Sequence, residues 1–165
     1  MADIHYHIER PGPRSHYIIP HLLRTMAGWD AVEVPNIEAF RGITGPKLCY
    51  GNLPVEGAFH VEASGFLEQV GTEPLEPEMQ EVRGMPLLFP TSAKFLPFDV
   101  FSAAFFALSR YEEYGRIERD AHGRPLSGAL HAIRHDYFDR PIVDEWLYFL
   151  ADTWREQDPD LPAMR

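Results

Sequence analysis

Two histidines four residues apart, His131 and His135, are the sharpest chemical signal in the sequence. On a helix, residues four apart lie on one face, so the two imidazoles could share a metal ion such as zinc. Asp136 and Asp139 follow closely enough to supply a third ligand. The segment is short, however, and such pairs also arise by chance. We therefore predict no metal and no other cofactor, and keep His131 and His135 as the candidate ligands of an alternative, a stand-alone metal-dependent hydrolase.

A second group of polar residues is expected at the ends of two helices that would pack together. Paired carboxylates beside an arginine can serve acid-base chemistry, but the same groups also form caps and helix-helix ion pairs. A nearby aromatic ring could stack on the apolar face of a sugar. We predict no catalytic residue here, but a ligand or domain interface made of Asp99, Arg110, Glu113, Arg140, Asp144 and Trp146.

Other chemical templates are absent from the sequence. It has no glycine-rich phosphate loop, no Gly-x-Ser-x-Gly nucleophile turn and no cysteine pair for zinc. Cys49, the only cysteine, lies in an apolar run and is expected to pack in the core. His5 and His7 alternate with apolar residues and are expected on a solvated strand face.

The elements that would position these residues begin with alternating strands and helices. Strands are predicted at 3–9, 29–34 and 47–50. Between them we predict a helix that reaches Gly28, kinked at or starting near Pro20, and a short helix over 37–41. This alternation predicts an α/β fold, with a mixed, mainly parallel sheet, helices on both faces and a single domain. A hairpin is predicted from strands at 58–62 and 66–70.

The second half of the chain is expected to be mainly helical. One helix runs over 98–114, capped by Asp99 and ended by Gly115, and another starts near Asp139. We predict a domain over 1–157 and a linker-like tail over 158–165. The predicted core consists of Ile4, Ile8, Leu22, Val32, Leu48, Leu88, Phe101, Phe105, Leu108, Leu147 and Leu150.

Composition narrows the class of partner. The formal charge of −10, from 25 acidic and 15 basic residues, repels phosphate backbones and anionic lipid surfaces, so we predict no nucleic-acid partner and no membrane partner. With one cysteine and no apolar window of membrane-spanning length, a cytoplasmic location is expected.

Several segments resemble one family. The residues that carry the resemblance are 96–99, 103–105, 108–114, 120–124 and 140–146, and more loosely 45–51. In these segments, among them Leu108-Ser109-Arg110-Tyr111-Glu112-Glu113-Tyr114, the chain is similar to the N-terminal region of bacterial polysaccharide-deacetylase-like proteins.

The resemblance implies a non-catalytic accessory module that packs against a deacetylase-type catalytic domain, in the same chain or in trans, and helps to bind a glycan. The family's deacetylase domain uses an Asp-Asp segment and a His-Ser/Thr-x-x-His segment. The chain has no such Asp-Asp segment, and Ala132 stands where the hydroxyl residue belongs, so the resemblance gives His131 and His135 no metal role. A purely structural domain without a ligand is a further alternative.

Overall fold

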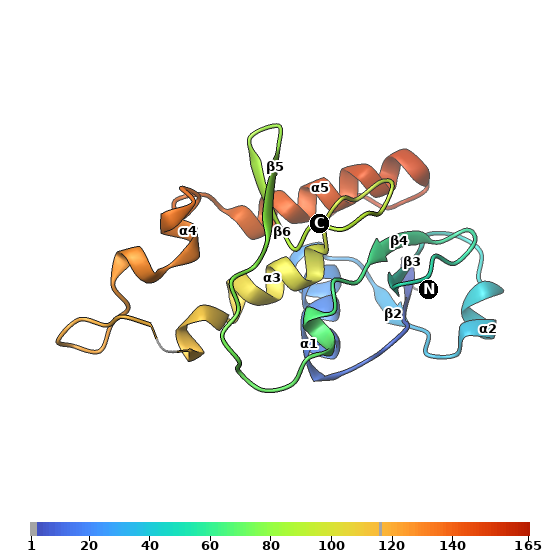
Figure 1. The fold of residues 1–165 in the computed structure, drawn as a ribbon. Coiled ribbons are helices and arrows are strands. Elements are labelled where there is room, and N and C mark those ends of the chain that lie inside the picture. The colour runs from blue at the N-terminus through green and yellow to red at the C-terminus, as the bar shows by residue number, and fades with distance from the viewer. Residues whose placement is uncertain (1–2, 116) are drawn as a thin grey trace.

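The computed structural model describes residues 3–115 and 117–165, which are built around a four-stranded parallel sheet (Figure 1). The strands are β1 (Ile4–Ile8), β2 (Ala31–Glu33), β3 (Lys47–Gly51) and β4 (Phe59–Glu62), in the order β2-β1-β3-β4. The predicted α/β fold with a mainly parallel sheet in one domain is confirmed. The antiparallel part is a separate ribbon of β5 (Met79–Val82) and β6 (Met85–Leu88).

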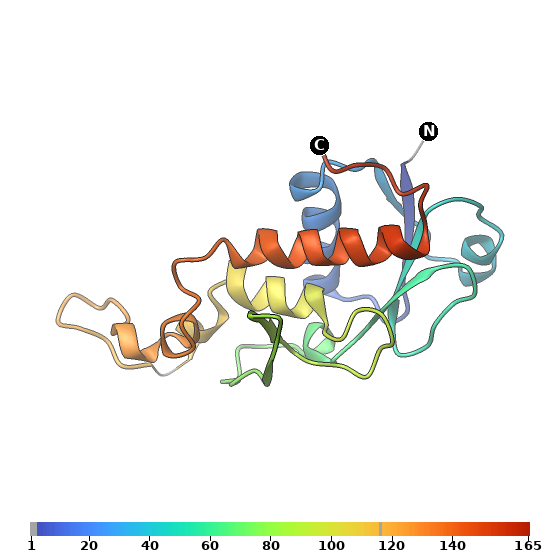
Figure 2. The same cartoon turned by 90° about the horizontal axis from the view of Figure 1, so that it is seen from above.

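Two helical segments connect the first three strands and lie on opposite faces of the sheet (Figure 2). α1 (Pro13–Pro20) continues as a π-helical stretch, His21–Met26, and α2 (Ile37–Arg41) precedes β3. Pro20 lies inside this helical segment. The helix therefore does not start at Pro20, and it continues past this residue. Since proline has no N–H to donate, the backbone bonding pattern changes from α to π beyond it.

The predicted hairpin over 58–70 is wrong. β4 pairs in parallel with β3, and Phe66–Glu68 is a 3₁₀ turn instead of a returning strand. Gly65 has φ 96°, a left-handed conformation that turns the chain after β4. Phe66 then stacks on Phe89 with the ring centroids 4.8 Å apart, so this segment is held by the aromatic core and not by strand pairing.

α3 (Val100–Leu108) packs against the long α5 (Ile142–Gln157). Asp99 caps α3 as predicted, because its Oδ1 accepts the N–H of Ser102 at 3.0 Å. The predicted helix over 98–114 nevertheless ends early. Arg110 has φ 52°, which breaks the α-helical path, and Tyr111–Tyr114 forms a 3₁₀ turn.

Residues 117–138, here called the arm, extend away from the sheet (Figures 1 and 2). The arm contains a 3₁₀ turn, Ser127–Ala129, and α4 (His131–Arg134). The segment expected to be a linker-like tail packs on the domain in the structure. Leu161 is buried, and the N–H of Arg165 donates to the carbonyl of Ala27 at 2.9 Å.

Most of the predicted core is buried, but Val32 and Leu108 are 40% and 41% exposed and Phe105 is half-buried. Cys49 is buried as predicted. The expected solvated position of His7 is wrong, because β1 is an inner strand whose two faces are both covered. Across the described ranges 3–115 and 117–165, no helix has the length and apolar character needed to cross a membrane.

Candidate metal centre

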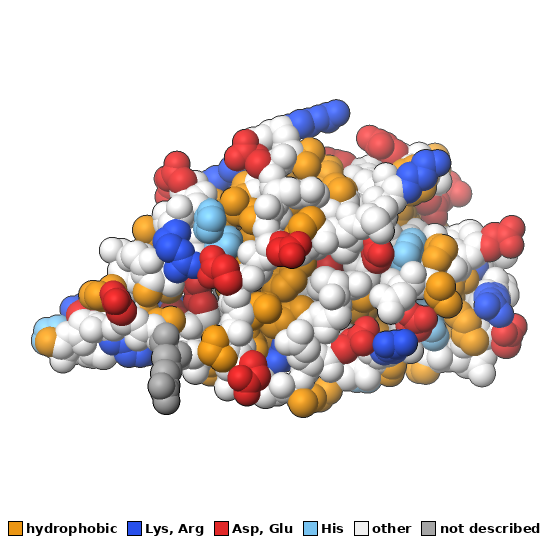
Figure 3. All heavy atoms as spheres, viewed as in Figure 1, with side chains coloured by type: hydrophobic (Ala, Val, Ile, Leu, Met, Phe, Trp, Pro, Cys, Tyr) orange, Lys and Arg blue, Asp and Glu red, His pale blue; other side chains and the backbone are white. Residues whose placement is uncertain are grey.

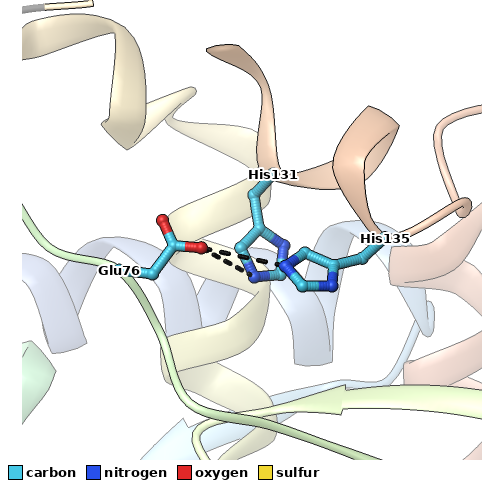
Figure 4. A group of neighbouring side chains, drawn as sticks. All are labelled: Glu76, His131 and His135. Carbon is cyan, nitrogen blue, oxygen red and sulfur yellow. Dashed lines mark ion pairs between the residues drawn. The ribbon is translucent and has the colours of Figure 1, made fainter. Parts of the chain in front are cut away.

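Glu76, His131 and His135 bring three potential metal-ligating atoms within 4.8 Å of one another (Figure 4). The two histidines come from α4 and the residue after it, and Glu76 comes from the long loop before β5. Nε2 of each histidine lies 3.8 Å from Oε1 of Glu76. Glu76 and His135 reach the surface, whereas His131 is buried. Figure 3 shows histidine side chains beside basic and acidic ones at this end of the molecule.

His131 is the most constrained member of this group. Its side chain is 1% exposed, and its Nε2 is buried without a hydrogen-bond partner. Nδ1 lies 2.6 Å from the hydroxyl of the buried Tyr137. Burial, followed by the charge of His135, lowers the pKa of His131 to about 4. The imidazole is therefore neutral at pH 7, its contact with Glu76 is no ion pair there, and an Nε2 lone pair is free when Nδ1 donates to Tyr137.

Arg134 and Glu112 hold the other parts of the centre. Nη2 of Arg134 donates to both oxygens of Glu76, at 2.8 and 2.7 Å. Partial burial opposes ionisation of Glu76, but the hydrogen bond and charge of Arg134 keep its pKa below the ordinary value. Oε2 of Glu112 accepts the backbone N–H of His131 at 2.7 Å, which fixes the start of α4. The ligand from the loop and those from α4 are thus already held together.

Two of the three separations between ligand atoms are close to those of a tetrahedral metal site. Zinc binds nitrogen and oxygen at about 2.0–2.1 Å, which puts neighbouring ligand atoms about 3.3–3.5 Å apart. The two 3.8 Å separations from Oε1 of Glu76 would have to close by only a few tenths of an ångström. With two imidazoles and one carboxylate, a fourth position is left for water.

Three of the six residues predicted to form an interface line one hollow of about 400 Å³ beside the centre: Arg110, Glu113 and Arg140. Arg110 pairs with Glu113, and Arg140 pairs with Glu145. Tyr137 lies in the wall of the same hollow, so this hollow and the metal centre share a side chain.

The other three predicted interface residues lie elsewhere. Asp99 is buried, and its Oδ2 accepts hydrogen bonds from Tyr50, Ser64 and Ser102 at 2.8, 3.0 and 2.6 Å, so it is a structural group. Trp146 is fully buried and donates to the carbonyl of Pro86 at 2.7 Å, which excludes it as an exposed sugar platform. Asp144 is exposed in the first turn of α5, and Glu145 instead pairs with Arg140.

Sequence reasoning missed Glu76 and Tyr137. Asp136 and Asp139 were expected to supply the third ligand, but the group that the structure brings together has Glu76 in that place. Glu76 precedes His131 by 55 residues in an acidic, proline-bearing loop, where no spacing pattern marks a ligand. Tyr137 lies only two residues after His135. Its hydroxyl could have been predicted from the sequence as an outer hydrogen-bond partner of a ligating histidine.

Comparison with known proteins shows the family to which the chain is similar. A family model described as a family of unknown function (DUF7033) matches residues 4–159, a span that contains the whole candidate centre. No curated protein matches the chain, and no solved structure does.

Proposed function

The chain belongs to the DUF7033 family, for which the family description gives no function, and we propose from its geometry that it binds a divalent transition metal ion, best fitted by zinc, through Glu76, His131 and His135. One observation carries the proposal. The buried Nε2 of His131 lacks a hydrogen-bond partner in the described structure, although such atoms are normally satisfied. A metal ion bound between the three side chains would satisfy it.

The donor types favour zinc over the common hard cations. Calcium and magnesium prefer sites made of oxygen ligands, whereas imidazole nitrogen suits zinc and its transition-metal neighbours. The neutral state of His131 helps, because a ligating imidazole must be deprotonated and this one already is at pH 7. Tyr137 would fix the imidazole orientation, as outer hydrogen bonds do for zinc-bound histidines.

Three protein ligands and an open position are the arrangement of catalytic zinc sites, in which the metal lowers the pKa of a bound water. The proposal therefore includes metal-dependent hydrolysis as the reaction class. Arg134, which donates to both oxygens of Glu76, would hold this carboxylate in place as a ligand.

Zinc titration of the purified chain, freed of metal with a chelator and then dialysed, tests this proposal. We expect one zinc ion per chain by isothermal titration calorimetry and by elemental analysis. His131→Ala and His135→Ala should abolish tight binding, whereas His122→Ala, an exposed histidine elsewhere on the arm, should not. Equal zinc affinity in the wild type and His131→Ala would overturn the assignment.

A second candidate function is a non-catalytic accessory module of a polysaccharide-deacetylase-like protein in the cytoplasm, in contact with the catalytic domain and a glycan. The hollow shared by Arg110, Glu113 and Arg140 favours it, because Phe138 in its wall is 65% exposed. Aromatic residues and arginine are enriched in the cores of protein interfaces.

This second candidate function is tested by adding a bacterial polysaccharide-deacetylase catalytic domain to the labelled chain. We expect the two proteins to form a complex. Phe138→Ser should weaken the complex, and Phe95→Ser, which changes an exposed ring in a different hollow, should leave it intact. Absence of a complex with the unmodified chain, or equal loss in both variants, would count against this candidate.

A further inference from the structure

The carboxyl edge of the parallel sheet contains a second candidate site, independent of the proposed metal centre. After β1 the chain crosses to β2 on one side, whereas β3 lies on the other side of β1. The connections that leave β1 and β3 therefore diverge at this edge. In open α/β sheets, ligands bind in the crevice outside the strand ends at such a reversal of strand order.

A hollow of about 400 Å³ lies at this edge. β1 contributes His7 and the following Glu9, and β3 contributes Cys49 and Tyr50. The other walls come from the β2–α2 connection, from α2 and from the loop after β3, through Pro35, Ile37, Arg41, Leu53, Pro54 and Val55. The connections on either side of the β1–β3 strand pair thus enclose the hollow.

The carboxylate of Glu9 is held in place across this edge. Its Oε2 accepts the N–H of Asn52 at 2.6 Å, and the side chain lies directly against Gly51. A Cβ atom at Gly51 would clash with both Oε2 and Cβ of Glu9, so the Glu9 side chain would have to move. Glycine at position 51 therefore gives the carboxylate its place at the end of β3.

His7 supplies a second fixed polar group in the wall. It is 9% exposed, packs against the ring of Phe40 with the centroids 5.4 Å apart, and has Nδ1 2.9 Å from the carbonyl of Val34. A carbonyl only accepts, so Nδ1 must carry the proton, and Nε2 of the neutral ring is then an acceptor. In the described part of the chain, Nε2 of His7 makes no hydrogen bond.

The chemistry of the walls selects the class of ligand. Glu9 and His7 offer acceptors, and the guanidinium of Arg41 in the same wall is already paired with Glu38 at 2.7 Å. The ligand is therefore expected to offer donors, and apolar side chains such as Ile37 and the 69% exposed Leu53 would cover an apolar face. Anions are disfavoured by the charge of Glu9. In addition, Pro11 and Pro13 remove two N–H donors from the connection after β1, where phosphate-binding folds place them.

We propose that this hollow binds a neutral, hydroxylated ring compound, either a monosaccharide or a nucleoside, whose hydroxyl groups donate to Glu9 and His7. The two sources share this chemistry. Monosaccharides and nucleosides differ in the group attached to the hydroxylated ring. Comparing the affinities of the two kinds of ligand therefore distinguishes between them.

Chemical-shift titration of the ¹⁵N-labelled chain with glucose, N-acetylglucosamine, adenosine and glucose 6-phosphate tests the proposal. We expect the amide of Asn52 to shift, and the shift to saturate, with at least one neutral probe. Glu9→Gln should weaken that binding about tenfold, since a hydrogen bond to a charged acceptor is lost. The matched control, Glu156→Gln at the exposed end of α5, should leave it unchanged.

Gly51→Ala provides a second variant, because the new methyl group must displace the Glu9 carboxylate. It should weaken the neutral probe at least as much as Glu9→Gln. No shift with any neutral probe, tighter binding of glucose 6-phosphate than of glucose, or unchanged binding in Glu9→Gln would each overturn the proposal. Zinc binding in Glu9→Gln reports on the metal centre separately, so failure of one proposal leaves the other testable.

Discussion

Replacing Tyr137 with phenylalanine removes one oxygen atom and should weaken zinc binding without touching a ligand. The hydroxyl lies 2.6 Å from Nδ1 of His131, and both side chains are buried. In a zinc-bound state Nδ1 must donate to this hydroxyl, so that Nε2 presents its lone pair to the metal. Without the hydroxyl, the donor loses its partner and the ring loses its fixed orientation.

The size of the effect follows from comparable outer hydrogen bonds at metal sites. Their loss typically costs about 10- to 100-fold in metal affinity, equal to about 1.4–2.7 kcal/mol. The metal-free protein should lose about 1–3 kcal/mol of stability as well, because a buried donor is left unpaired. Competition with a zinc chelator measures the first quantity, and urea unfolding in the presence of that chelator measures the second.

Tyr148→Phe is the matched control, because Tyr148 is 59% exposed on α5 and should affect neither quantity. If Tyr137→Phe lowers the stability of the metal-free protein but leaves zinc affinity equal to that of the wild type, Tyr137 is only a packing group. His131 would then not bind zinc through an oriented Nε2, and the reasoning would be refuted.

The remaining predictions concern groups outside the metal centre. Burial raises the pKa of Asp99 above 3.8, so the folded state binds this proton more tightly than the unfolded chain. The free energy of unfolding should therefore fall as the pH rises from 3.8 to the raised pKa of Asp99 in the folded state. Urea unfolding of Asp99→Asn should show no such fall. A free energy of unfolding that rises over this pH range in the wild type would contradict a raised pKa. Trp146→Phe leaves the Pro86 carbonyl unpaired and should cost about 1–3 kcal/mol by urea unfolding, and no loss would argue against the buried hydrogen bond. Burial also raises the pKa of the Cys49 thiol, so a thiol reagent should react only after unfolding, and immediate reaction would show that the thiol is accessible.

Much of the fold could be predicted because local signals agreed with the tertiary structure. The alternation of strand and helix over the first 50 residues predicted the parallel sheet, and the Asp99 cap located the start of α3. The strand at β4 was predicted, but its pairing was wrong. Parallel strands are usually joined by a helical crossover, whereas residues 52–58 join β3 to β4 without a helix.

Buried polar groups were the least predictable feature. Lys47 begins β3, and its Nζ donates to the carbonyls of Phe40, Arg41 and Ile43 at the end of α2. Arg14 is likewise buried, with its guanidinium 4.8 Å from the ring centroid of Phe66. Both cations are satisfied by partners brought together only by folding. The candidate metal centre depends on the same kind of long-range contact, which explains why only its histidine pair was visible in the sequence.

A zinc ion at the proposed centre would restrict the motion of the arm relative to the rest of the molecule. A few side chains tie α4 to the rest of the molecule, chiefly Arg134 to Glu76 and Glu112 to the start of the helix. Such a segment is expected to open locally, without global unfolding. Zinc held between the arm and the Glu76 loop would raise the free energy of that opening by about 2.7 kcal/mol at a concentration of 100 times its Kd. Amide hydrogen exchange in α4 would then slow about 100-fold, so zinc concentration would set how often the arm detaches.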